Sequence, residues 1–576
     1  MTKTPPDCAR VRIRLDGQSL RVAAGSSVAA ALALRAPGNS RISVSGEKRA
    51  AFCGMGICHE CRVLVEGHLR LACQTPCHDG MRVDTVLDPT SWAGVPDRAA
   101  GHHRTCDLLI VGAGPAGMSA ALAAAASGRA IVLVDDNPAA GGQIWRDGPA
   151  AALPAPAQRL REQLARHANI TVLCGTRVVG LAGQPGQAAL LLEDARQGWT
   201  QHYDSLILCT GARELLLPFP GWTLPGVTGA GGLQALVKAG TSLRGQRIVI
   251  AGTGPLLLAA ARTARDAGAT VVRIAEQADW RALLRFASGL PRWPVKALQA
   301  MTLFHPQYRS ASHVLEASGN GRLQHVRLRR ANGEEQIACH RLACGFGLIP
   351  NTQLGQMLGC ELDAHQALQV DGLLQTSVPG VFAAGECTGI GGSERSQIQG
   401  AIAGHAAIGE LAQATRLAPD LARWQGFANT VRRHFTLRSP LLTLARPDTL
   451  ICRCEDVPQS ALAACNSWID AKLHTRCGMG ACQGRVCGAA TQALYGWTPA
   501  PPKHLLAPAR VGTLAGMGDS IGALAGMGDS IGSLASVGDS IGTLAGVSDN
   551  IGALAGLGAS LASDGRPPPS TSRSTE

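Results

Sequence analysis

Two glycine-rich loops, each between a strand-like and a helix-like segment, constrain the fold of this chain more than any other feature. The first contains Gly112, Gly114 and Gly117 and follows the apolar run DLLIV. Glycines at this spacing allow a tight turn, a close approach to a pyrophosphate and close helix–strand packing. An acidic residue that binds a ribose should end the next strand about twenty residues later. Asp135 lies there, with Asp136 as the alternative, so the pattern predicts a dinucleotide-binding unit.

The second loop contains Gly252 and Gly254 within the segment RIVIAGTGPLLLAAA. Leu257 occupies the place of the third glycine, which would push helix and strand apart and weaken nucleotide binding. Glu276, at the end of VVRIAE, could still bind a ribose. Two interpretations stay open: an NAD(P)H site, or a unit kept only for structure, which we favour. No C-x-x-C pair lies in residues 216–345 or beside the first loop, which argues against a dithiol mechanism like that of thioredoxin reductase.

A first cysteine cluster precedes these loops. Cys53, Cys58, Cys61 and Cys73 are spaced C-x4-C-x2-C-x11-C, and the first three match the plant-type [2Fe–2S] loop. Structural zinc normally uses C-x2-C pairs instead. We therefore predict a [2Fe–2S] cluster on these four thiols and expect the fifth, Cys77, to be a bystander.

A second cysteine cluster follows residue 440. It offers Cys452, Cys454, Cys477, Cys482 and Cys487, and a helix is expected between its two halves, over 460–475. A C-x-C pair and a distant C-x4-C pair can enclose a second [2Fe–2S] centre, with zinc as the alternative. Two overlapping C-x4-C pairs are present, so spacing alone leaves the fourth ligand undecided.

Composition excludes several other functions. Aromatic residues make up 3% of the chain and the excess of basic residues, 53 against 41 acidic, is dispersed, so nucleic-acid binding is not expected. The N-terminal sequence lacks the apolar core of a signal peptide. Residues 108–128 are uncharged, yet they contain the first glycine loop, so we expect a buried strand and helix and no transmembrane span. No Ser-His-Asp or paired-carboxylate group stands out, and we predict no acid–base catalytic residue.

Further motifs resemble known proteins. PAAGGQIW, with Gly142 and Gln143, and VPGVFAAGECTG, with Gly385 and Glu386, resemble two-dinucleotide-domain flavoproteins. That resemblance implies FAD at the first loop, with Glu386 near its phosphoribityl chain. The final cysteine segment resembles the bacterioferritin-associated-ferredoxin-like module. It implies Cys452, Cys454, Cys482 and Cys487 as ligands, with Cys477 as the alternative.

Taken in order, these modules resemble the hydrogen cyanide synthase, opine oxidase and D-hydroxyproline dehydrogenase family, here with two usually separate subunits fused. The resemblance implies an amine-oxidase-like FAD partner subunit that oxidises a C–N bond of an opine, hydroxyproline-like or glycine-like substrate. This chain would relay the electrons to a downstream acceptor, for which a quinone is one candidate. It would then be cytoplasmic, or peripheral on the inner membrane face if it reduces a quinone. The alternative is a self-sufficient NAD(P)H-dependent flavin and iron–sulfur reductase.

The expected fold class is multidomain α/β. The expected domains are a β-grasp ferredoxin domain at 11–95, FAD-binding parts at 105–215 and 346–440, an inserted NAD(P)H-type subdomain at 216–345, a second [2Fe–2S] domain at 441–500, and a linker, repeat and tail at 501–576. Within the last, residues 511–560 are five aligned decads whose many glycines disfavour a stable lone helix.

Overall fold

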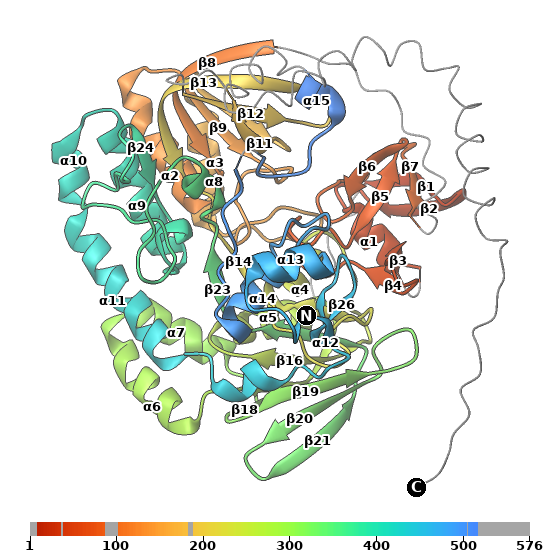
Figure 1. Ribbon diagram of the computed structural model, residues 1–576. Coiled ribbons are helices and arrows are strands. Elements are labelled where there is room, and N and C mark those ends of the chain that lie inside the picture. The colour runs from red at the N-terminus through yellow and green to blue at the C-terminus, as the bar shows by residue number, and fades with distance from the viewer. Residues whose placement is uncertain (1–8, 36–37, 87–101, 183–187, 504, 516–576) are drawn as a thin grey trace, which may run out of the picture.

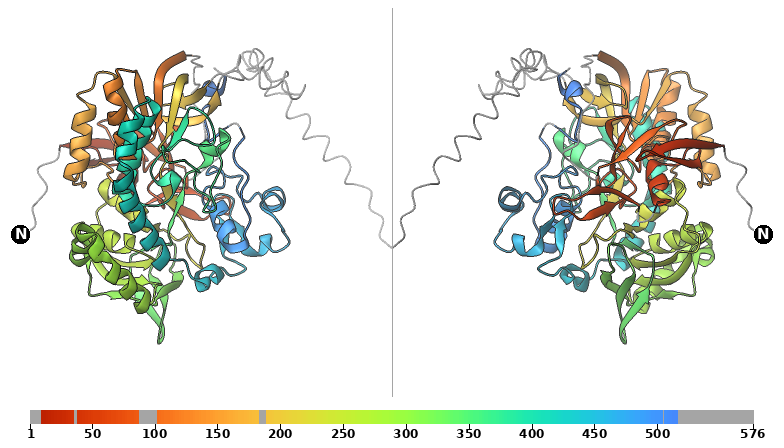
Figure 2. Two further views of the ribbon diagram at one scale, coloured as in Figure 1. Left: turned by 90° about the vertical axis from the view of Figure 1, so that its left-hand side faces the viewer. Right: turned by 90° about the vertical axis from the view of Figure 1, so that its right-hand side faces the viewer.

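The computed structural model describes residues 9–35, 38–86, 102–182, 188–503 and 505–515. Figure 1 shows the flavoprotein-like sheet at the top, the N-terminal domain at the right and the second α/β unit at the bottom. The C-terminal cysteine-containing segment lies in front of the second unit, and the turned views of Figure 2 agree with this arrangement. Most of the expected decad repeat and the tail lie outside the described residues.

The N-terminal domain is a five-stranded sheet of order β2-β1-β7-β5-β6 with one short helix. Two hairpins, β1–β2 and β5–β6, form most of this sheet, and Asp16 and Gly17 turn the first with positive φ at both positions. Its elements are β1 (Arg10–Leu15), β2 (Gln18–Ala23), α1 (Val28–Ala33), β3 (Asn39–Ile42), β4 (Lys48–Ala50), β5 (Arg62–Val65), β6 (His68–Leu71) and β7 (Arg82–Thr85).

The largest sheet has the order β10-β9-β8-β13-β12-β11, with β24 also paired to β13. Strand β8 begins at His102 and not after Arg104, because residues 102–105 extend the ladder with β13. The elements in and around it are β8 (His102–Val111), α2 (Pro115–Ala124), β9 (Ile131–Asp135), α3 (Ala155–Leu164), β10 (Ile170–Cys174), β11 (Arg177–Ala182), β12 (Ala189–Glu193), β13 (Gly198–Leu208), α8 (Gln353–Met357), β24 (Val381–Ala383), α9 (Gly392–Ala407), α10 (Leu411–Arg416) and α11 (Ala418–His434).

The second α/β unit has a parallel sheet of order β15-β22-β16-β17-β18, and the small sheet β14–β23 joins it to the first unit. Its elements are β14 (Ala212–Glu214), β15 (Val227–Gly229), α4 (Ala230–Lys238), β16 (Arg247–Gly252), α5 (Leu256–Asp266), β17 (Thr270–Glu276), α6 (Trp280–Gly289), α7 (Pro294–Leu303), β18 (Tyr308–Arg309), β19 (His313–Ser318), β20 (His325–Arg330), β21 (Gly333–Ala338), β22 (Arg341–Gly345) and β23 (Leu348–Pro350). Each glycine loop therefore connects a parallel strand to a helix, as predicted.

The C-terminal segment is small and its helices are short. The expectation of one helix over 460–475 is wrong, because the segment forms two helices. Ser467 begins the second by accepting a hydrogen bond from the backbone N–H of Asp470, and this N-cap requires an extended residue in the middle of the segment. The elements are β25 (Leu450–Cys452), β26 (Val457–Pro458), α12 (Gln459–Leu462), α13 (Trp468–Thr475), α14 (Cys487–Tyr495) and α15 (Val511–Ala515).

No helix among the described residues combines the length and apolarity needed to cross a bilayer. The uncharged stretch over 108–128 is the end of β8 followed by α2, and both pack into one buried core. The strand and helix expected there are present.

Close packing of α2 on α9 depends on Gly400, since a Cβ atom there would overlap the carbonyl oxygen of Ala116. We expect Gly400→Ala to lower the free energy of unfolding by about 1–3 kcal/mol, measured by denaturant unfolding. Gly372→Ala is the control, since a Cβ there would meet no atom within 4 Å. Equal stability of the two variants would contradict this account.

Candidate functional site

A cavity of about 610 Å³ opens at the carboxyl end of the largest sheet. Three segments that are distant in the sequence contribute to its wall. They are the first glycine loop with the acidic end of β9, the segment PAAGGQIW, and the segment that contains Glu386. The predicted residues that line it are Gly112, Gly114, Asp135, Gly142, Gln143, Gly385 and Glu386, together with Asp136. Gly117, the remaining predicted residue of the first loop, lies beneath this wall in α2.

The glycine loop has the shape that a pyrophosphate requires. A Cβ on Gly117 would overlap the carbonyl oxygen of Gly112, so this glycine lets α2 approach β8. A Cβ on Gly142 would lie 2.9 Å from the Cα of Gly114, so a side chain there would fill the cradle. The backbone can therefore approach a bound phosphate at the start of α2, where helix N–H groups favour an anion.

Backbone N–H groups of two adjacent loops fix the carboxylate of Asp135. Its Oδ2 accepts a hydrogen bond from the backbone N–H of Ala113 at 2.7 Å, and its Oδ1 accepts from the backbone N–H of Asn137 at 2.8 Å. Burial, with a smaller effect from Asp136, raises the pKa of Asp135 to about 6. Asp135 thus fixes the loop, and both carboxylates line the cavity where a ribose would lie.

The cavity wall also carries polar groups whose partners the protein does not supply. Gln74 Nε2 is buried without a hydrogen-bond partner, and Gln74 lines the cavity. Arg485 also lines it, donates to the Leu506 carbonyl at 2.5 Å and forms no ion pair with a described carboxylate. Unpaired buried cations and donors are unfavourable unless an anionic or polar ligand satisfies them. The residues present therefore fit FAD.

Sequence reasoning missed Glu214, which also lines this cavity. Its two carboxylate oxygens accept hydrogen bonds from the backbone N–H groups of Gly231 and Gly232, at 2.7 and 3.0 Å, in the first turn of α4. Burial raises the pKa of Glu214 to about 7. No motif surrounds this residue in the sequence, so only the contact between β14 and α4 identifies it.

The four predicted thiols of the first cluster are buried, with Cys53, Cys58 and Cys61 in the loop before β5 and Cys73 beside Cys61 just after β6. Cys53 Sγ accepts from the backbone N–H groups of Met55 and Cys58 at 3.4 Å, and Cys61 Sγ accepts from that of Cys73 at 3.4 Å. A hydrogen bond from the Cys58 thiol lowers the pKa of Cys53 to about 6. Backbone N–H groups directed at sulfur suit thiolates that hold a cluster.

Cys77 is buried in the same hydrophobic core as Cys61 and Cys73, and desolvation alone raises its pKa to about 12. Nothing in its surroundings stabilises a thiolate, which fits the expectation of a bystander.

The second set of thiols forms two adjoining groups. The sulfur atoms of Cys452, Cys477 and Cys487 lie within 4.8 Å of one another. A hydrogen bond from the Cys454 thiol lowers the pKa of Cys482, so these two form the other group. The structure therefore brings all five thiols together. Because Cys477 and Cys487 both lie beside Cys452, the geometry leaves open which of these two is the ligand. Cys487 begins α14, and a hydrogen bond with Cys452 raises the pKa of both Cys477 and Cys487.

The second glycine loop is covered by the chain itself. The Phe435 side chain, just after α11, lies 3.7–4.0 Å from the position of a Cβ on Gly254, where the loop would face a pyrophosphate. Its ring packs on that of Phe286 with centroids 4.9 Å apart. Gln277 donates to the carbonyl of Thr436 at 2.9 Å, which fixes the covering segment.

Glu276, the acidic residue at the end of β17, also has hydrogen-bond donors within the protein. Glu276 is fully buried and accepts hydrogen bonds from the backbone N–H groups of Gly254 and Ala278, at 2.8 and 2.9 Å, and from the Tyr308 hydroxyl at 3.2 Å. Leu257, in place of the third glycine, is buried in the core of this unit. Gly252 thus ends β16, Gly254 lies in the loop after it and Glu276 lies at the end of β17, as expected, with Phe435 packed beside Gly254.

Family models match two parts of the chain. The model described as pyridine nucleotide-disulphide oxidoreductase matches residues 106–408, and the model described as 2Fe-2S iron-sulfur cluster binding domain matches residues 9–87. These matches confirm a flavoprotein preceded by a 2Fe–2S domain.

Curated relatives cover most of the chain. An opine oxidase subunit of Rhizobium meliloti is 32% identical over 460 residues, covering 71% of this chain and 84% of that protein. The HcnB subunit of hydrogen cyanide synthase from Pseudomonas aeruginosa is 34% identical over 426 residues, covering 66% and 90%. The resemblance inferred from the motifs is therefore confirmed. L-proline dehydrogenase from P. horikoshii, at 18% identity, shares the fold with a TM-score of 0.65 over 89% of this chain and 100% of that chain.

Single cysteine variants test the ligand assignment of the second group. We expect Cys454→Ser and Cys487→Ser each to lower bound iron from about four to about two atoms per chain, whereas Cys477→Ser retains about four. Iron and acid-labile sulfide analysis measures this. Cys465→Ser, a partly exposed thiol of the same segment, is the control. If Cys477→Ser lost iron and Cys487→Ser retained it, Cys477 would be the ligand in place of Cys487.

Proposed function

The chain belongs to the pyridine nucleotide-disulphide oxidoreductase family as an FAD-dependent enzyme with an N-terminal 2Fe–2S domain, and from this premise we propose that it is the electron-transfer subunit of an amine-oxidising complex. The complex would oxidise a C–N bond of an opine, hydroxyproline-like or glycine-like substrate. Support comes from relatives that are named as subunits of an opine oxidase and of a hydrogen cyanide synthase.

The observation that carries this proposal is that both cysteine groups adjoin the FAD cavity. Met55 and Ile57, in the loop between Cys53 and Cys58, line it from one side. Arg485, between Cys482 and Cys487, lines it from another. A flavin accepts two electrons together and releases them singly, which suits one-electron centres on either side.

The residues of this chain would act by binding and positioning. Gly112, Gly114 and Gly142 give the backbone room for the pyrophosphate, and Asp135 holds their loop. Arg485 would offset negative charge beside the cofactor. We assign no acid–base residue, because the C–N bond would be broken on the partner protein.

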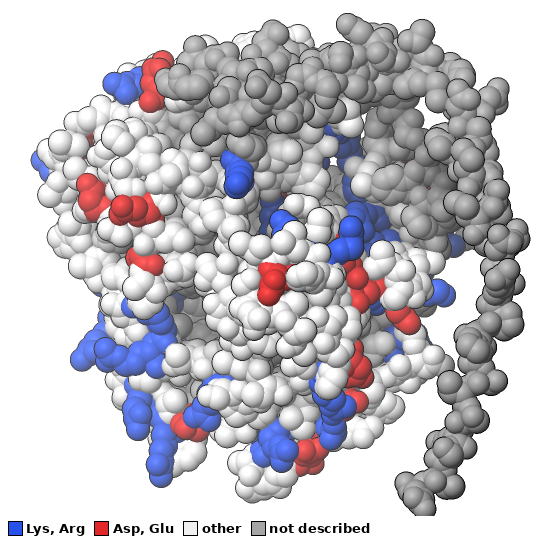
Figure 3. Space-filling view, in the orientation of Figure 1, with Lys and Arg blue, Asp and Glu red and all other residues white. Residues whose placement is uncertain are grey.

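We also propose a binding surface for that partner, which supports a multi-subunit assembly. Helices α6 and α7 have no buried residue, and the large apolar side chains exposed on and beside them are Trp280, Leu284, Val295, Leu298, Met301 and Phe304. The stretch 280–304 contains four basic residues and no acidic residue. Figure 3 shows Lys and Arg side chains gathered over this part of the surface. An apolar, basic face of this kind suits a partner with an acidic rim.

The alternative function, a self-sufficient NAD(P)H-dependent reductase, has less support. It needs an open second glycine loop, and Phe435 lies over Gly254. It also needs a carboxylate available to ribose, whereas Glu276 already accepts three hydrogen bonds from the protein.

Reduction by NADH separates the two functions. We expect millimolar NADH to leave the flavin of the purified chain oxidised under anaerobic conditions, because Phe435 occupies the nucleotide position. Absorbance of the flavin reports the result, and dithionite, which needs no binding site, is the positive control. Rapid bleaching by NADH would make the chain a reductase in its own right.

Reconstitution tests the proposed role directly. We expect the purified chain to contain one FAD and about four irons, and its flavin and iron–sulfur signals to become reduced only when an amine-oxidase-like FAD protein and its amine substrate are both added. Optical and EPR spectra measure this, with the partner alone and the substrate alone as controls. Reduction by the amine without the partner would contradict the division of labour.

A further inference from the structure

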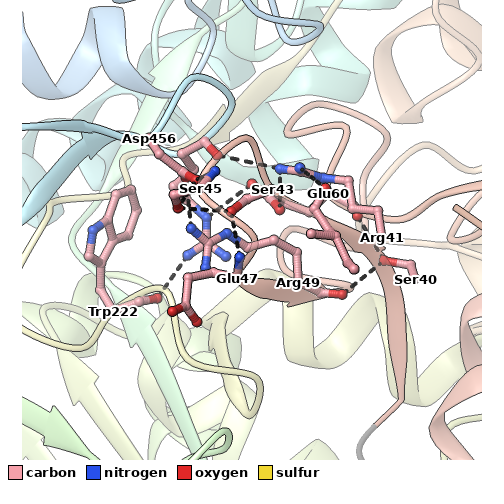
Figure 4. A network of polar contacts seen from close by, with 11 residues as sticks. Ser40, Arg41, Ser43, Ser45, Glu47, Arg49, Glu60, Trp222 and Asp456 are labelled. Atoms are coloured by element: carbon pink, nitrogen blue, oxygen red, sulfur yellow. Dashed lines mark hydrogen bonds and ion pairs between the residues drawn. The ribbon is translucent and has the colours of Figure 1, made fainter. Parts of the chain in front are cut away.

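A buried polar network joins the N-terminal domain to the C-terminal cysteine segment (Figure 4). Its N-terminal members come from β3, from β4 and from the loop that carries the first cysteines. Its C-terminal members come from the turn between β25 and β26, which carries Cys452 and Cys454. The two cysteine groups also share one hydrophobic core, which includes Phe52, Cys53, Cys58 and all five C-terminal thiols.

Glu60 and Arg453 are the centre of this network. Glu60 is fully buried, and its Oε1 lies 3.2 Å from Nε of Arg453, while its Oε2 lies 3.0 Å from Nη2 of Arg41. The Arg453 side chain is 4% exposed. Glu60 directly precedes Cys61, and Arg453 stands between Cys452 and Cys454. The ion pair therefore links the ligand loops of the two cysteine groups.

Two aromatic rings hold the Arg453 guanidinium. It lies 4.0 Å from the ring centroid of Phe52 and 5.0 Å from that of Trp222, and its Nη1 donates to the Trp222 carbonyl at 2.8 Å. Trp222 in turn donates from its ring to the carbonyl of Leu450 at 2.8 Å. A planar guanidinium between two rings has one favoured orientation, which a lysine could not reproduce.

A second buried ion pair, at the edge of the network, also links the N-terminal domain to the turn between β25 and β26. Arg49 Nη2 lies 2.7 Å from Oδ1 of Asp456, and the side chains are 3% and 4% exposed. Asp456 also accepts from the backbone N–H of Ser45 at 3.0 Å. Figure 4 shows Ser45 and Arg49 directed at Asp456 from the N-terminal domain.

Separation of the domains would break both ion pairs that cross the contact, leaving Arg453, Arg49 and Asp456 without these partners and Glu60 with Arg41 alone. Removing one member of a buried ion pair is strongly unfavourable because an uncompensated charge stays out of water. The contact surface is therefore unlike that of a domain that detaches and returns during each turnover.

We propose that the Glu60–Arg453 pair, backed by Arg49–Asp456, fixes the N-terminal 2Fe–2S domain permanently on the C-terminal cysteine segment. Glu60 and Arg453 are positioning residues that hold the two ligand loops together, so that electrons pass directly between the two cysteine groups. The transfer moves one electron, makes or breaks no bond and takes up no proton. The reductant is the amine substrate of the proposed function, acting through the partner protein, and the direct transfer rests on that proposed function.

Cleavage of the connection between the domains tests the fixed contact. A protease recognition sequence is inserted between residues 88 and 100 of the full chain, and the chain is cut after purification. We expect the N-terminal fragment to stay bound through size-exclusion chromatography. Arg453→Gln should raise its dissociation constant at least thirty-fold, or about 2 kcal/mol, because Glu60 and the two rings lose their partner.

Matched variants keep this test decisive. Asp456→Asn removes the second ion pair without changing a residue next to a cysteine, and we expect it to weaken the contact in the same direction. Arg273→Gln is the control, since it breaks an ion pair with Glu335 inside the second α/β unit. The proposal is wrong if the N-terminal fragment of the otherwise unchanged chain separates after cleavage. It is also wrong if the fragments of the Arg453→Gln and Asp456→Asn variants stay bound as tightly as that of the control.

Metal analysis and EPR separate failure of the contact from absence of the second centre, and the reconstitution with partner protein and amine tests the proposed function independently of both. In the reduced chain we expect magnetic broadening between two centres, lost when the Arg453→Gln fragment dissociates. A bound fragment with only two irons per chain would leave the fixed contact intact and refute the second centre, and with it the direct transfer. Four irons with a freely dissociating fragment would leave the second centre intact and refute the fixed contact.

Discussion

A carboxylate fully removed from water is the constraint on which the arrangement of the domains depends. Glu60 is fully buried, and Arg41 and Arg453 approach its carboxylate from two different parts of the chain. The first arginine belongs to the N-terminal sheet and the second to the C-terminal cysteine turn. Arg41 pairs with Glu60 within the N-terminal domain, whereas Arg453 reaches Glu60 only when the two domains are in contact, so this ion pair fixes the position of each cysteine loop relative to the other.

Two neighbouring arginines, Arg213 and Arg485, lie close to the second cysteine group, and Arg485 also lines the cavity. Arg213, whose side chain is buried, donates to the carbonyl of Arg485 at 3.3 Å, and burial lowers the pKa of Arg213 to about 10. Neither arginine forms an ion pair with a described carboxylate, so their charge is available to anionic cofactors. FAD phosphates and thiolate-bound clusters are anionic, and nearby cations favour the reduced, more negative state of a cluster.

Sequence patterns predicted the residues of both glycine loops and both cysteine groups because each motif is local. A strand, a turn and a helix fix Gly112, Gly117 and Asp135 relative to one another within about twenty-five residues. The contacts of Phe435 with the Gly254 loop and of Arg453 with Glu60 join segments far apart in the sequence, and no periodicity encodes them. The break between α12 and α13 was missed because the Ser467 cap lies inside a stretch with helical composition.

The second α/β unit also supports the two cysteine groups, as its contacts with each of them indicate. A Cβ on Gly54 would lie 2.9 Å from the carbonyl oxygen of Gly232, at the start of α4, so the first cysteine loop rests directly on this unit. Trp222, from the same unit, supports Arg453 beside the second cysteine group. Both cysteine groups therefore pack on one rigid sheet-and-helix platform. Leu257 packs in the core of this unit and Phe435 lies beside its glycine loop, so both side chains add apolar contacts to the platform.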